Sequence, residues 1–172
     1  MLDSSALAKQ FDRGEEVYVS FQYLTRDIEI DINSLLVKVL SRIDMAYLYD
    51  TFESVVRELV QNAMKANMKR VSFKDLKLDI NNSDDYPKGM RKFKKVVYRP
   101  ELLREKLLAS PYRVVFRLHK TGSGVLLEIS NNARVLPVEL ERIMFRARKA
   151  AECGNFAEAY ENMYDESEGA GL

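Results

Sequence analysis

The chain has 172 residues, enough for one ordinary domain and too few for two. Its composition, 47% hydrophobic and 31% charged, is globular and excludes intrinsic disorder. The formal net charge of +1 gives no overall preference for polyanions, and a single cysteine, Cys153, excludes an internal disulfide and suits a reducing compartment. No apolar run approaches the ~20 residues that cross a bilayer, and no signal-peptide pattern opens the chain. We expect a soluble, cytoplasmic single domain over residues 1–172.

The N-terminal region, residues 1–49, predicts two strands and a helix. Residues 16–25 alternate apolar and polar positions, as a strand does, and residues 28–32 alternate apolar with acidic ones. The two predicted strands would pair as a hairpin. A helix capped by Asn33 or Ser34 follows, with apolar residues at helical spacing: Leu35, Leu36, Val39, Leu40 and Ile43.

A second helix is predicted from Asp50 to about Asn67. Asp50 and Glu53 have the spacing of a capping box, and a broad apolar stripe follows: Phe52, Val55, Val56, Leu59, Val60 and Ala63. Residues 71–73 predict a short strand. Residues 81–89 read as a loop, and Pro100 opens a helix that runs to Leu108.

The remainder predicts a hairpin and a helix. Strands over residues 112–118 and 125–130 flank the turn Thr121–Gly124, and Pro137 opens a helix with Gly154 as its C-cap. The expected buried face of this helix is Leu140, Ile143, Met144 and Ala147. Hairpins among alternating helices favour an α/β (α+β) two-layer sandwich, a mixed sheet covered on one face by helices.

Three polar features carry candidate chemistry. Glu58 and Asn62 lie four residues apart on one helix face, which Lys65 extends. An Asn carbonyl is a hard ligand for Mg²⁺ and a neighbouring Glu can orient water, but a solvated polar face is the ordinary interpretation of this pair taken alone. Asn131 and Asn132 leave a strand, where they suit either a tight turn or a ligand contact. Gly169 and Gly171 offer backbone N–H groups to a phosphate, unless they belong to a plain tail.

In order, these features resemble the GHKL or Bergerat superfamily of histidine-kinase-like ATPases. ESVVRELVQNAMKAN is similar to the N box, LEISNNARVLPVELERIMF resembles the first glycine box, and SEGAGL resembles the start of a second glycine box in which the chain ends. The resemblance implies a Bergerat fold that binds Mg-ATP. It also implies Glu58 as the catalytic, water-orienting residue, Asn62 as the Mg²⁺ ligand and a lid over residues 146–172. The nucleotide contacts it implies are Asn62, Lys65, Asn131, Ala133, Gly169 and Gly171.

The chain departs from this pattern in the first glycine box. The family's adenine-reading Asp falls on Asn131, whose bond to the base would lose charge assistance, and its glycines fall on Ala133 and Val135. Val135 is expected to narrow the pocket or block a turn with positive φ. The single histidine, His119, lies at a hairpin end and is expected to be an exposed strand residue rather than a phosphoacceptor.

The resemblance implies an ATP-binding domain of a signalling protein with a protein partner, acting by phosphoryl transfer or conformational switching. Two alternatives stay open. One is a pseudo-ATPase that works as an interaction module. The other is a relative of the mismatch-repair or topoisomerase ATPases, whose N box is also close to ELVQNA.

The insertion at residues 74–111 bears on that last alternative. Residues 88–106 hold eight basic residues and two acids: Lys88, Arg91, Lys92, Lys94, Lys95, Arg99, Arg104 and Lys106 against Glu101 and Glu105. A solvated insertion is the ordinary interpretation. Nucleic acid or an acidic partner is the functional one.

Overall fold

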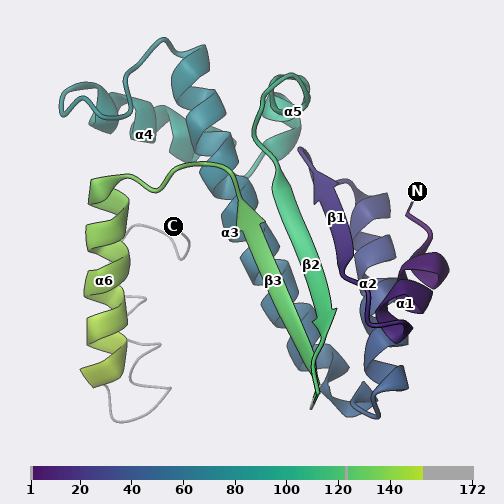
Figure 1. Cartoon of the computed structure of the whole chain (residues 1–172). Helices are drawn as coiled ribbons and strands as arrows, with labels where there is room; N and C mark the ends of the chain where they lie inside the picture. The colour runs from purple at the N-terminus through teal and green to yellow at the C-terminus, as the bar shows by residue number, and fades with distance from the viewer. Residues whose placement is uncertain (1, 123, 153–172) are drawn as a thin grey trace. The chain divides into compact units, whose positions relative to one another are not determined.

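The computed structural model describes residues 2–122 and 124–152. The chain divides into two compact units, Met1–Ala133 and Arg134–Leu172, which we describe separately. The first unit combines helices with a small sheet, so the expected α+β class is confirmed (Figure 1).

The sheet consists of β1 (Val17–Phe21), β2 (Val114–Lys120) and β3 (Val125–Asn131) in the order β1-β2-β3. Both pairs are antiparallel, so these strands do not form the mixed sheet that we expected. The predicted hairpin is confirmed: the N–H of Thr121 donates to the carbonyl of Gly124 at 2.9 Å, and so tight a turn can join only antiparallel strands.

One face of the sheet is buried and the other is open. Across the three strands Val19 pairs with Phe116 and Phe116 with Ile129, and the neighbouring rows follow the same alternation. The buried face joins the core formed by apolar residues of α1 (Ser4–Asp12), α2 (Arg26–Arg42) and α3 (Tyr49–Asp75). Figure 1 shows α3 running behind the sheet.

Helix α2 replaces the second predicted strand, so the strand at residues 28–32 is wrong. Thr25 caps the helix by accepting a hydrogen bond from the N–H of Ile28 at 3.3 Å, and Asp27 and Glu29 lie in the first turn, where acids are favourable. Ser34 is therefore inside the helix and caps nothing. The predicted apolar stripe is confirmed, with Leu35, Leu36, Val39 and Leu40 buried.

Helix α3 is longer than predicted and begins differently. It follows a 3₁₀ turn, η1 (Ala46–Leu48), and its N-cap, Leu48, makes no side-chain hydrogen bond. The predicted capping box is therefore wrong: Glu53 accepts a hydrogen bond from Arg57 instead. The predicted strand at 71–73 is also wrong, because α3 continues through these residues, and all three are buried within it.

The segment after α3 is more helical than predicted. Helix α4 (Asp85–Val96) begins inside the expected loop at 81–89. The helix predicted from Pro100 to Leu108 is present as a 3₁₀ turn, η2 (Pro100–Leu103), followed by α5 (Arg104–Leu108).

In the second unit, α6 (Pro137–Glu152) is the regular element that the described residues contain. It begins at Pro137 as predicted, and Glu139 accepts a hydrogen bond from the N–H of Leu136 at 3.0 Å. Of its predicted buried face, Leu140, Met144 and Ala147 are exposed and Ile143 is half-buried. Residues 134–152 supply no second element on which the helix would bury that face. The expected C-cap, Gly154, lies outside the described residues.

Among the helices described, none combines the length and apolar character needed to cross a membrane.

Candidate functional site

The predicted N-box residues lie together on one face of α3. Glu58 and Asn62 are one helical turn apart, and Nδ2 of Asn62 donates to Oε1 of Glu58 at 3.0 Å. Glu58 is exposed. Asn62 is half-buried, and its Oδ1 is enclosed with no hydrogen-bond partner in the described part of the chain. The pair thus presents one carboxylate to solvent and leaves one amide oxygen unsatisfied.

Asn131 connects the end of β3 to this part of α3. Its Nδ2 donates to the carbonyl of Ala63 at 3.2 Å, and its Oδ1 accepts from the N–H of Ala133 at the same distance. Ala63 directly follows Asn62, and Ala133 is buried. Asn131 is therefore bonded to the residue that follows Asn62 on α3, and Ala133 is bonded to Asn131.

Of the remaining predicted nucleotide contacts, Lys65 is among the described residues and the two glycines are not. Lys65 is half-buried on α3, three residues after Asn62. Gly169 and Gly171 lie outside the described residues, as does most of the predicted lid. Residues 146–152 of that lid form the end of α6. Val135 is 53% exposed, and its φ is not positive, so the described backbone makes no turn that valine would block.

Asn67 belongs to this region and was missed by sequence reasoning. It is fully buried, and neither its Nδ2 nor its Oδ1 has a hydrogen-bond partner among the described residues. Side chains on a helix lean toward its N-terminus, so the amide of Asn67 covers the turn of α3 that contains Ala63. An asparagine on an otherwise apolar helix face was the available signal, but the sequence alone does not show that it is buried.

Asn132, by contrast, has a structural role. Its Oδ1 accepts from the N–H of Arg113 and its Nδ2 donates to the carbonyl of Pro111, both at 2.8 Å. These two bonds tie the end of β3 to the segment before β2. Of the two adjacent asparagines, Asn131 alone contacts α3.

The open face of the sheet carries a second polar cluster, in a shallow hollow lined by Glu16, Tyr18, Arg117, His119 and Glu128. Arg117 bonds Glu16 at 3.0 Å and pairs with Glu128, and its guanidinium lies 5.6 Å from the ring centre of Tyr18. Nε2 of His119 is 3.7 Å from Glu16, on strand β2 as predicted and 38% exposed. These charges satisfy one another across neighbouring strands, as cross-strand pairs do.

No group of three or more His, Cys, Asp or Glu side chains within residues 2–122 and 124–152 is arranged to hold a metal. A cation at α3 would therefore depend on the Asn62 oxygen and on oxygens of its ligand.

The chain is similar to an uncharacterized protein of Treponema pallidum (strain Nichols), with 27% identity over 177 residues. The match covers all of this chain and 34% of the relative, so the chain spans about a third of the relative's length. No family model matches the chain, and no solved structure does.

Proposed function

We propose that this chain is an ATP-binding domain of the histidine-kinase-like, GHKL type, acting in a signalling protein by Mg-ATP-dependent phosphoryl transfer or conformational switching. The hydrogen bond from Asn131 to the Ala63 carbonyl is the observation that carries the proposal. It joins the strand that ends in the first glycine box to the helix that bears the N box, beside Asn62. In this proposal the sheet and its helices are part of a two-layer Bergerat sandwich.

The residues present fit a magnesium nucleotide at one atom in particular. The Oδ1 of Asn62 is a hard oxygen ligand that accepts no hydrogen bond within the described chain. Glu58, held one turn away, would orient water from its exposed side. Lys65 would reach a phosphate. The bound cation would supply neutralisation of the phosphate charge.

Calorimetric titration of the chain with Mg-ATP tests this proposal. We expect saturable binding that Asn62→Ala weakens at least tenfold, about 1.4 kcal/mol, because the substitution removes the cation's ligand. Gln61→Ala is the matched control, since Gln61 is exposed and adjacent on the same helix. Absence of saturable binding, or equal weakening by both substitutions, would overturn the assignment.

One observation favours the pseudo-ATPase as a second candidate. Both amide atoms of Asn131 already bond backbone groups of the chain itself, at Ala63 and Ala133. A base would have to use the second N–H of Nδ2 or the remaining lone pair of Oδ1, or displace one of these bonds. If the native chain shows no saturable binding of Mg-ATP and Asn131→Asp does bind it, the pseudo-ATPase candidate holds and the domain works as an interaction module.

A further inference from the structure

Helix α4 carries a row of basic side chains on the face turned away from the core. Gly89 and Phe93 are buried, and Met90, Val96 and Val97 pack against the core. Lys88, Arg91, Lys92 and Lys95 are exposed and recur at helical spacing. Arg99, also exposed, follows the helix. We call Arg91, Lys92, Lys95 and Arg99 the basic stripe.

The acidic side chains that the structure describes do not neutralise the basic stripe. None of its four residues has an ion pair within the described part of the chain, although Lys88 lies 3.4 Å from Asp85. Arginines elsewhere do pair, as Arg42 with Asp12 at 3.1 Å and Arg117 with Glu16 at 3.0 Å. Like charges along one helix face repel each other. The chain's net charge is only +1, so the stripe is a local concentration of positive charge.

The helix that presents the stripe is closely seated on α3. A Cβ at Gly89 would lie 2.2 Å from the ring of Phe73, so the two helices approach as near as glycine permits. Phe93, one helical turn after Gly89, is also buried and holds the same face of α4 against the core. Arg91, Lys92 and Lys95 are therefore held on a packed helix, and Arg99 follows just after it.

An aromatic ring lies next to these charges. Tyr98, between Lys95 and Arg99 in the sequence, is 79% exposed, and Leu102 beyond it is 57% exposed. A tyrosine left in water beside cations offers a flat surface on which a base can stack. Bases inside a duplex are not accessible for such stacking, and an acidic protein has no need of it.

We infer that the basic stripe binds single-stranded nucleic acid, with Arg91, Lys92, Lys95 and Arg99 contacting phosphates and Tyr98 stacking on a base. The inference is independent of nucleotide binding at α3. Each phosphate neutralised on a single strand contributes about −0.7 to the slope of log K against log salt. Four contacts therefore predict a slope of about −3.

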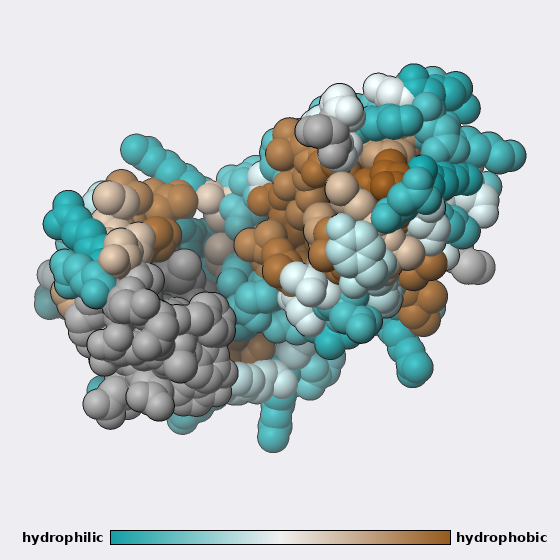
Figure 2. Space-filling view, turned by 90° about the horizontal axis from the view of Figure 1, so that it is seen from below, coloured by the Kyte–Doolittle hydropathy of each residue, from teal (hydrophilic) through white to brown (hydrophobic). Residues whose placement is uncertain are grey.

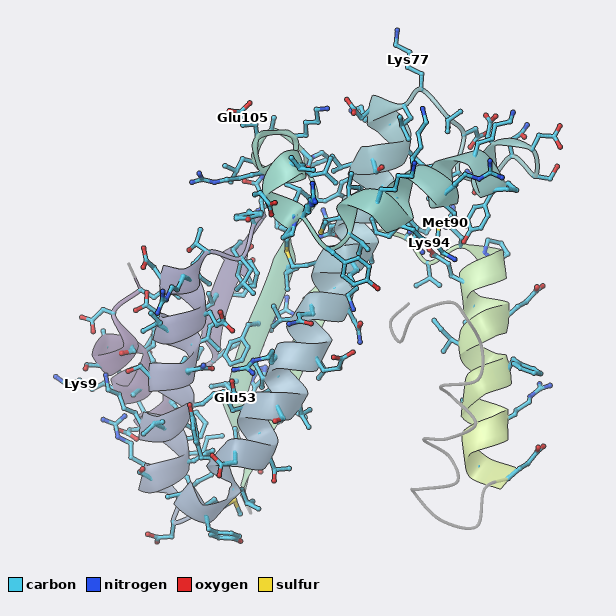
Figure 3. All side chains as sticks on the ribbon, turned by 180° about the vertical axis from the view of Figure 1, so that it is seen from behind. Lys9, Glu53, Lys77, Met90, Lys94 and Glu105 are labelled. Carbon is cyan, nitrogen blue, oxygen red and sulfur yellow. The ribbon has the colours of Figure 1, made fainter. Side chains whose placement is uncertain are left out.

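Fluorescence anisotropy with a labelled 12-nucleotide oligo-dT, titrated with the full chain at several salt concentrations, tests the inference. We expect Lys92→Gln/Lys95→Gln to weaken binding at least tenfold and to reduce the slope by more than 1, and Tyr98→Ala to weaken binding about fivefold with the slope unchanged. Lys9→Gln/Lys120→Gln removes the same charge from exposed positions on α1 and β2, and should change little. Figure 3 shows Lys9 projecting from α1, away from α4.

Other outcomes would overturn the inference. Equal losses in the two double variants would mean that net charge alone drives binding. Tighter binding of a duplex of the same length, or no effect of Tyr98→Ala, would show that the basic stripe does not select single strands by base stacking. Complete displacement of the oligonucleotide by poly-glutamate at equal charge concentration would assign the stripe to an acidic protein instead.

Discussion

Asn67 places an amide inside the first unit with neither its nitrogen nor its oxygen hydrogen-bonded by the described residues. A buried, unsatisfied polar group costs about 1–3 kcal/mol relative to an apolar one of similar shape. The amide therefore lowers stability unless a bound group satisfies it. Asn67 lies one helical turn after Ala63, whose carbonyl accepts a hydrogen bond from Asn131.

We expect Asn67→Leu to raise the free energy of unfolding by about 1 kcal/mol, because an apolar side chain replaces the unsatisfied amide. Urea denaturation followed by circular dichroism measures this. Gln61→Leu, at an exposed position on the same helix, should stay within about 0.5 kcal/mol of the native chain. If Asn67→Leu lowers the free energy of unfolding while Gln61→Leu does not, the amide of Asn67 is hydrogen-bonded in the folded protein.

Asp3 gives a prediction about pH. Its carboxylate caps α1, and the N–H of Ala6, then that of Ser5, hold the pKa of Asp3 below its ordinary value, with Lys38 adding to the effect. A lowered pKa in the folded state means that the cap stabilises the protein above about pH 4, the ordinary range of Asp. That stabilisation is lost as the pH falls through the folded-state pKa.

We expect Asp3→Asn to keep the cap but to flatten the dependence of melting temperature on pH between about 5 and 2, relative to the native chain. Asp3→Ala should lower the melting temperature at pH 7 as well. Thermal melts across this pH range check both. A native pH profile retained in Asp3→Asn would show that other carboxylates control acid stability.

At the scale of elements, the contact between α3 and α4 depends on Gly89. Alanine is the better helix former by about 1 kcal/mol, but a methyl group here would meet the Phe73 ring at 2.2 Å. The clash outweighs the propensity, because overpacking a core typically costs about 1–3 kcal/mol.

Gly89→Ala should therefore lower the free energy of unfolding by about 1 kcal/mol or more, measured by urea denaturation. Gly122→Ala is the control, since a Cβ at Gly122 would meet nothing within 4 Å and its φ is not positive. Adding Phe73→Leu should recover part of the loss. A neutral Gly89→Ala would show that α4 can move away from α3 without cost.

The elements that were predicted correctly carry an unambiguous pattern. The β2–β3 hairpin has two strands around Thr121–Gly124, and α6 begins at a proline. Residues 28–32 alternate as a strand does, but five residues are too few to distinguish period two from a helix face. A helix is favoured here because Thr25 provides an N-cap and the apolar stripe of α2 continues beyond these five residues. Val71 is β-branched and Phe73 aromatic, yet both are buried as part of α3.

Burial on the helices was predicted less well than their presence. Val55 and Leu59 of the expected stripe are 51% and 42% exposed, whereas Met64 and Met68 are buried. Helical spacing defines an apolar face, but only the packing partner decides which edge of that face is covered. Figure 2 shows brown, apolar side chains gathered on the surface of the larger unit among teal, hydrophilic ones.

At the scale of the whole chain, the candidate site was partly predictable. Glu58, Asn62 and Asn131 follow from motif and spacing, and the structure brings them to one turn of α3. Asn67 did not follow, because its role depends on tertiary burial. The basic insertion was visible as composition, but only the structure distinguishes the basic stripe, which has no ion pair among the described residues, from Lys106, which pairs with Asp75 at 2.7 Å.

The central claim is that a magnesium nucleotide binds where β3 meets α3. Mn²⁺ favours the same oxygen ligands as Mg²⁺ and broadens nearby nuclear magnetic resonance signals, so titration of the labelled chain with Mn-ATP locates the cation directly. We expect the backbone amide signals of Asn62, Ala63 and Asn131 to broaden first, while those of Lys9 and Lys120 stay sharp, and we expect Asn62→Ala to abolish the effect. Uniform broadening, or broadening centred elsewhere in the chain, would contradict the claim.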